Sequence, residues 1–302
     1  MDVSFFWGTS ALLTPPTCDR FEKVYVLLAL LSCVLGGISK FGIGRYRGRI
    51  SAHGIILVSA CASTTTYVLF GLLTHELAFS PIDLVPALIG GVCNVTGNMA
   101  FIKASQRGKL GVVAGVGTAA CLVPLMYSVL IGESLVPRAW FGLGVLAMGM
   151  LLLYLPDMWR DRQVSNSTPV FLLALVGAFC WGVAMVVLDL GTHISFMGTL
   201  ALAQLPPIVV AVVIGCSAGG LLGGVSRTTV VPVLGVGVAL ALAGIAFYWA
   251  SNTGDIGVTS MVRALNPLVV ALLAAFFLRE RMTRSEVAGL AVVLGGACLI
   301  AI

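Results

Sequence analysis

The sequence predicts an all-α integral membrane protein with ten transmembrane helices in two inverted five-helix repeats. The first observation behind this prediction is composition: 59% of the 302 residues are hydrophobic, 10% are charged, and the mean hydropathy is +1.07. Soluble globular domains are far more polar. The second is the recurrence of apolar windows of about 20 residues, the length of helix that crosses a bilayer core of roughly 30 Å. These windows lack the alternation of barrel strands, so helices are the only spans we expect.

The third observation is an internal repeat. The stretch AFIKASQRGKLGV at 100–112 matches AFYWASNTGDIGV at 246–258 at seven of thirteen positions, at an offset of 146 residues. The repeat divides the chain into residues 24–156 and 170–302, each with five expected spans. Because five is an odd number, the second repeat must enter the membrane from the opposite side. The two repeats are therefore expected to be antiparallel.

The ten expected spans are apolar runs joined by loops that are too short to hold a soluble domain. In chain order they cover residues 24–44, 54–73, 84–105, 111–132, 139–156, 170–190, 196–218, 229–250, 258–278 and 287–302. The segment 1–23 precedes them, and its apolar run of twelve residues makes only about 18 Å of helix before Pro15 and Pro16. We interpret this segment as interfacial, with a short extra span as the alternative.

Basic residues mark the ends of the odd-numbered spans and predict the orientation. The loops after spans 1, 3, 5, 7 and 9 hold eleven of the seventeen lysines and arginines, whereas the other four loops hold only Arg138. Because short cytoplasmic loops retain positive charge, we expect the loops after odd spans in the cytoplasm and both ends of the bundle outside. The eleven residues are Arg45, Arg47, Arg49, Arg107, Lys109, Arg160, Arg162, Arg227, Arg279, Arg281 and Arg284.

Several stretches resemble the drug/metabolite transporter superfamily, EamA type. They are CWG at 180–182, ALNPLVVALLAAFFLRERMT at 264–283 followed by GLAVVLGGACLI, and a weaker first-half copy, CLVPLMYSVLIGESL at 121–135. The resemblance covers the chain beyond residue 23. It implies alternating access by a ten-helix bundle around a central substrate cavity. It also implies both termini in the cytoplasm, which conflicts with the charge count.

Three basic residues fall within the spans: Lys40, Lys103 and Arg263. A charge at the bilayer centre costs about 2.5–3.5 kcal/mol on an insertion scale, so it should face a cavity or a partner. Arg263, about six residues inside span 9, is the strongest candidate to bind an anionic group of a substrate. Lys40 and Lys103 lie near predicted cytoplasmic ends, where they either assist Arg263 or extend to lipid headgroups.

Polar and aromatic side chains supply further candidates for the substrate site. Asn94 and Asn98 share one helical face, where they either contact substrate or bond neighbouring helices. Their counterparts in the second repeat are Leu240 and Gly244. Two aromatic residues of span 8 either stack on substrate or anchor the helix at the interface. The set is completed by residues of spans 2, 8 and 9: Tyr67, Tyr248, Trp249 and Asn266.

Prolines interrupt three of the spans and are candidate hinges or plain packing kinks. Pro206 and Pro207 stand in span 7, Pro267 in span 9 and Pro124 in span 4. Asp189, near the outer end of span 6, is a candidate for a coupling proton, with an interfacial surface acid as the alternative.

The predicted function is a secondary active transporter that exports a small metabolite, either an anion or an amino acid, across the cell (inner or plasma) membrane. Proton or ion coupling is open, and the oligomeric state is not predicted. A membrane channel or a non-transporting scaffold is the alternative. An enzyme is not expected, because the three histidines lie in different loops or span ends and no Walker motif is present. We expect no cofactor, no metal site and no nucleic-acid partner, since the cysteines lack Cys-x-x-Cys pairing and the basic residues are spread over short loops.

Overall fold

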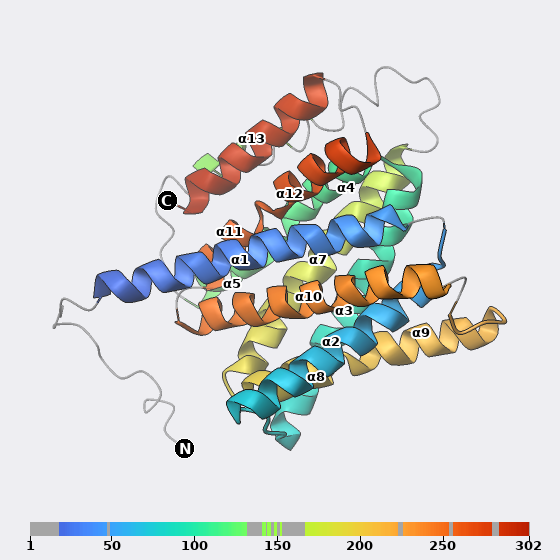
Figure 1. The fold of residues 1–302 in the computed structure, drawn as a ribbon. Helices are drawn as coiled ribbons and strands as arrows, with labels where there is room; N and C mark the ends of the chain where they lie inside the picture. The colour runs from blue at the N-terminus through green and yellow to red at the C-terminus, as the bar shows by residue number, and fades with distance from the viewer. Residues whose placement is uncertain are drawn as a thin grey trace.

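In the computed structural model of the protein, the described residues are 18–46, 49–131, 167–222, 226–253, 256–279 and 284–301, with single residues and pairs between 141 and 152. The predicted span 139–156 lies largely outside these residues, and so do residues 1–17. Helices are the regular elements of the described chain, and they lie side by side in one bundle (Figure 1).

Eight described helical segments are long and apolar enough to cross a membrane, and each overlaps one of the predicted spans. They are Leu27–Arg45, Ala52–Thr74, Leu84–Arg107, Leu110–Leu130, Pro169–Thr192, Phe196–Ser217, Thr228–Thr253 and Thr259–Leu278. The last helix, α13 (Arg284–Ala301), contains a shorter apolar segment, Val287–Gly296, where the tenth span is predicted. The protein is therefore an integral multi-pass membrane protein.

Five uninterrupted helices each contain one of the eight described segments that can cross a membrane. They are α1 (Cys18–Arg45), α2 (Ala52–Thr74), α3 (Leu84–Arg107), α7 (Ser167–Thr192) and α10 (Arg227–Thr253). The helix α1 begins at Cys18, so residues 18–23, which the sequence analysis assigned to an N-terminal segment, belong to the first long helix.

Three of the spans that the structure describes are broken within the bundle. Span 4 consists of α4 (Leu110–Val116), the 3-10 segment η3 (Gly117–Cys121) and α5 (Leu122–Leu130). Span 7 consists of α8 (Phe196–Leu202) and α9 (Leu205–Ser217). Span 9 consists of α11 (Ile256–Arg263), α12 (Asn266–Leu273) and the π-helical η4 (Ala274–Leu278).

A proline lies just beyond each break. Pro206 and Pro267 occupy the first turns of α9 and α12, where a missing backbone N–H is tolerated. Pro124 stands in the first turn of α5 and cannot donate to Ala120, which lies within the 3-10 segment. The helix breaks thus follow from the chemistry of these prolines.

The long helices pack in two pairs around the centre of the bundle. α1 lies between α10 on one side and α11 and α12 on the other, and α10 also contacts α2 (Figure 1). On the other side of the bundle α3 packs along α7. Small residues let these backbones approach: a Cβ at Gly97 of α3 would lie 2.6 Å from Cδ1 of Trp181.

Hydrogen bonds and an apolar outer surface complete the membrane fold. The buried hydroxyls of Ser32 and Ser63 donate to the α10 carbonyls of Ala243 and Gly237, both at 2.8 Å. Large apolar side chains are exposed along the helices, among them Leu72, Val213 and Phe276. In a lipid environment such side chains face hydrocarbon rather than water, as a multi-pass protein requires.

Candidate functional site

A cavity of about 80 Å³ lies among the long helices and the helix breaks. Its polar and charged lining comes from α1, α2, α3, α7, α10, α11 and the α8–α9 break. Tyr67 lies seven residues, about 10 Å of helix, before the end of α2, and Arg263 lies the same distance after the start of α11 and is its last residue. The residues with polar or charged groups in the lining are Lys40, Tyr67, Asn94, Asn98, Trp181, Gln204, Tyr248 and Arg263.

Lys40 enters the cavity from the C-terminal half of α1. Its Nζ lies 4.1 Å from the centroid of the Trp181 ring and donates a hydrogen bond of 3.4 Å to Oδ1 of Asn266. Trp181 is itself fixed against Phe101, with ring centroids 5.3 Å apart. The ammonium is thus held by a ring face and a neutral amide, neither of which cancels its charge.

Arg263 is the last residue of α11, where the helix dipole favours a cation. Its guanidinium carbon lies 4.6 Å from the centroid of the Phe247 ring. Among the described residues, Arg263 makes no ion pair with a carboxylate. A half-buried arginine that rests on an aromatic face leaves N–H donors for a ligand.

Three buried neutral groups face the same cavity. The Gln204 side chain stands in the break between α8 and α9 and is 6% exposed, while Tyr67 and Tyr248 are 4% and 5% exposed. None of these three side chains has a hydrogen-bond partner among the described residues. Buried polar groups are normally paired, so these side chains indicate a polar ligand or water in the cavity.

Asn94 and Asn98 form the wall that α3 contributes. Nδ2 of Asn98 donates to Oδ1 of Asn94 at 3.2 Å, which leaves the carbonyl oxygen of Asn98 and the amide nitrogen of Asn94 for other partners. Both residues also line an adjoining space of about 10 Å³ that reaches Ile55 and Ser59 of α2. The pair therefore bonds within its own helix and still faces the cavity.

The structure brings together most of the side chains predicted from the sequence. Asn266 stands just behind the cavity wall, 4% exposed, as the partner of Lys40. Lys103 is exposed on α3 and lies outside the cavity lining. Trp249 is 45% exposed between Phe70 and Phe196 and lines a separate peripheral cavity.

A profile described as the EamA-like transporter family matches residues 168–302. Residues 168–302 are an EamA-like transporter domain. This family belongs to the drug/metabolite transporter superfamily, so the resemblance in the motifs at 180–182 and 264–283 is confirmed. The EamA-like domain supplies Trp181, Gln204 and Arg263 to the cavity.

A crystal structure of another protein resembles most of the chain. It is 16% identical in sequence, has a TM-score of 0.72, and the match covers 92% of this chain and 98% of the other. At that identity the similarity shows the fold alone, but it extends across the half of the chain that precedes the EamA-like domain. No curated protein matches the chain.

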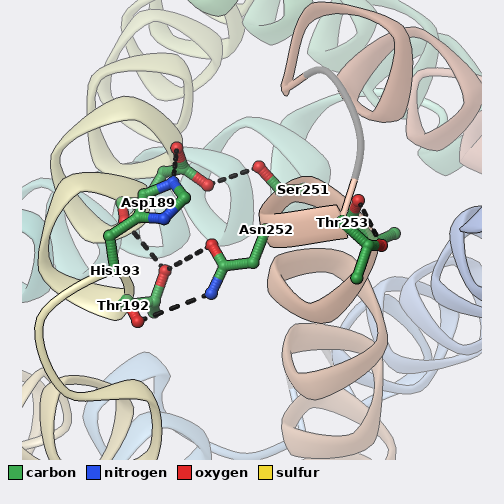
Figure 2. A network of polar contacts seen from close by, with 7 residues as sticks. Asp189, Thr192, His193, Ser251, Asn252 and Thr253 are labelled. Atoms are coloured by element: carbon green, nitrogen blue, oxygen red, sulfur yellow. Dashed lines mark hydrogen bonds and ion pairs between the residues drawn. The ribbon is translucent and has the colours of Figure 1, made fainter. Parts of the chain in front are cut away.

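Asp189 of the EamA-like domain lies outside the cavity, in a polar network between the ends of α7 and α10 (Figure 2). The Ser251 hydroxyl donates to its carboxylate, and Nε2 of His193 lies 3.6 Å from Oδ2. Thr192 bonds to the side chain of Asn252, which donates back to the Thr192 carbonyl at 3.4 Å. Asp189 is 6% exposed, which contradicts the alternative prediction that it is an interfacial surface acid.

Two side chains of the cavity were missed by sequence reasoning. Trp181 entered the sequence analysis only within the CWG motif, and Gln204, two residues before Pro206, was not a candidate. A glutamine at a helix break inside an apolar span is a signal that could have identified Gln204, because an unpaired amide is costly in a membrane. No metal site is formed by clusters of His, Cys, Asp or Glu in the described part of the EamA-like domain or of the preceding half.

Proposed function

We propose that this protein is a secondary active transporter that moves a small metabolite through the central cavity by alternating access. One observation carries the proposal: positions that correspond in the two sequence halves line the same cavity. Asn94 and Leu240 correspond at an offset of 146, as do Asn98 and Gly244, and all four are in the lining. In transporters built from inverted repeats the substrate site lies at the interface between the repeats.

Helix packing supports the inverted repeat of residues 24–156 and 170–302. The contact of α1 with α10 joins spans 1 and 8, and that of α7 with α3 joins the corresponding spans 6 and 3. Exchanging the halves therefore turns one major contact into the other. The break in span 4 begins at Gly117, and the break in span 9 begins at Ala264, 147 residues later. This separation is close to the repeat offset of 146, so the two breaks also correspond. Two halves with equivalent contacts can exchange conformations at a small cost in free energy.

The broken helices supply elements that can move. We propose the breaks beside Pro206, Pro207 and Pro267, and the 3-10 turn before Pro124, as the hinges of this exchange. Export across the cell membrane is part of the proposal and rests on the family resemblance together with the predicted cytoplasmic loops.

Transport in proteoliposomes tests this function. We expect purified protein to give saturable uptake of one class of compound from a panel of organic anions, amino acids, sugars and lipophilic cations, with acceleration by substrate on the opposite side. Ala184→Phe, which fills the cavity lining, should lower that uptake by about tenfold or more because a bulky ring displaces the ligand. Gly235→Phe, on the open surface of α10, is the matched control and should retain uptake.

Other outcomes would point to the alternatives. A current that does not saturate with concentration would favour the channel. Folded protein without flux of any compound would favour the scaffold, and equal effects of Ala184→Phe and Gly235→Phe would remove the cavity from the proposed pathway.

The buried carboxylate of Asp189 has a predicted effect on stability and a proposed role in proton coupling. Asp189→Ala should lower the free energy of unfolding by about 1–3 kcal/mol, because the buried Ser251 hydroxyl loses its acceptor. Asp189→Asn retains an acceptor oxygen and should be less destabilised in a thermal unfolding assay.

If Asp189 carries the coupling proton, as we propose, Asp189→Asn should exchange substrate but fail to accumulate it under a pH gradient. Accumulation at the wild-type level, as expected for the exposed control Glu76→Gln, would contradict the coupling role.

A further inference from the structure

We propose that the central cavity selects a small dianion, carrying either two carboxylates or one phosphate monoester, over a zwitterionic amino acid. The inference rests on the proposed function, because it assigns a substrate class to the same site. Of the described residues that line the cavity, two are charged, Lys40 and Arg263, and both are basic. The lining therefore offers two positive charges and no carboxylate.

The two cations flank the same helix break. Arg263 ends α11, and Lys40 bonds to Asn266, the first residue of α12, so both charged groups meet the wall where span 9 is interrupted. A ligand at this place meets both charges rather than one. Two anionic groups, or one doubly charged group, would then be matched by two donors.

The rings beneath the cations hold them without neutralising them. Trp181 and Phe247 attract cations through their faces, a weaker interaction than a contact with an anion. Two cations without a carboxylate partner among the described residues repel each other, and burial removes part of their hydration. A dianion removes both penalties at once, whereas a monoanion leaves one positive charge uncompensated.

The remaining polar groups also favour an anion. Gln204, Tyr67 and Tyr248 each carry an N–H or O–H donor without a partner among the described residues. Gln204 is the residue before α9, so the positive end of that helix dipole lies in the wall as well. The ammonium group of an amino acid would meet two like charges and only neutral acceptors.

The size of the cavity limits the ligand. One water molecule needs about 10–15 Å³ of such space, so about 80 Å³ holds about five to eight waters, the volume of a compact compound of about eight to ten heavy atoms. Four-carbon dicarboxylates and three-carbon phosphate monoesters are of this scale. Larger anions such as nucleotides are not expected to fit this conformation.

Ligand competition tests the inference. Purified full-length protein is titrated at pH 7.5 with succinate, glycerol 3-phosphate, butyrate and alanine, and thermal shift and proteoliposome exchange are recorded. We expect succinate or glycerol 3-phosphate to bind at least about tenfold more tightly than butyrate or alanine, and the ranking of the two dianions distinguishes carboxylate from phosphate. Lys40→Gln and Arg263→Gln should each weaken dianion binding by about 30-fold or more, since each leaves part of the ligand charge unpaired.

Lys103→Gln is the matched control, because it removes the same charge from a lysine outside the cavity. It should leave dianion affinity unchanged. Lys40→Arg retains the charge and should keep the preference for dianions. This variant keeps the inference testable if Lys40→Gln fails to fold.

The outcomes separate this inference from the proposed function. Saturable exchange in which alanine or butyrate binds as tightly as the dianions would overturn the inference but leave the proposed transport function standing. Dianion affinities of Lys40→Gln and Arg263→Gln within threefold of wild type would do the same. Dianion-dependent thermal shifts without exchange of any compound would support the site and contradict transport.

Discussion

Trp181→Ala is expected to lower the free energy of unfolding by about 3–5 kcal/mol and to abolish ligand binding in the central cavity. The indole is 8% exposed, packs on Phe101 at 5.3 Å between ring centroids, and lies beneath the Lys40 ammonium at 4.1 Å. Truncation to alanine leaves a void between α3 and α7, which costs about this much in protein cores. It also releases Lys40 from its ring, so the charge loses its position in the cavity.

Thermal unfolding in detergent and the thermal shift on adding ligand measure these two effects. Trp181→Phe keeps a ring under Lys40 and should retain part of both. Trp249→Ala removes the same side chain at a 45% exposed peripheral position and should leave ligand binding unchanged. If Trp181→Ala kept wild-type ligand affinity, Trp181 would have only a packing role.

Gly237→Leu is expected to prevent most of the chain from reaching the folded state. A Cβ at this position of α10 would lie 2.7 Å from Cβ of Ala62 and 2.9 Å from Cα of Ser59, so α2 and α10 would have to separate. Separation also breaks the hydrogen bond from Ser63 to the Gly237 carbonyl, 2.8 Å long. Overpacking of this kind costs about 1–3 kcal/mol or more, and membrane helices depend on close approach through small residues.

The fraction of protein that elutes as a single species in size-exclusion chromatography reports this loss. Gly235→Leu is the matched control two residues away in the same helix, where a Cβ meets no atom within 4 Å. Similar elution profiles for the two variants would rule out a close α2–α10 contact at Gly237.

Several parts of the fold could be predicted from the sequence because membrane helices obey local rules. An apolar run of about 20 residues in lipid must satisfy its own backbone, so its length and composition predict a helix, and eight of the predicted spans have a described helix that can cross the membrane. The breaks in spans 7 and 9 could also be located, since Pro206 and Pro267 act on their own helix. Pro124 also marked the break in span 4, but the sequence did not predict that the five residues before Leu122 form a 3-10 helix.

The candidate site was predicted less completely, for a physical reason. Lys40 and Lys103 are equivalent in the sequence: each is a basic residue near the end of an apolar run. Which of them faces a cavity depends on helix rotation and on neighbours far along the chain. Lys40 meets Trp181 and Asn266, which are 141 and 226 residues away in the sequence, whereas Lys103 is exposed on the surface of α3.

The sequence by itself determined that the chain lies in a membrane, where most of its spans run, and that the EamA-like half carries an arginine and broken helices. These properties arise from single segments and the free energy of placing them in lipid. Only the tertiary structure decided that Arg263, Lys40, Gln204 and the two tyrosines share one cavity, and that Asp189 joins α7 to α10 outside it. Such groupings depend on how helices from distant parts of the sequence pack together. Small residues allow close packing, but their local pattern does not specify which helices meet.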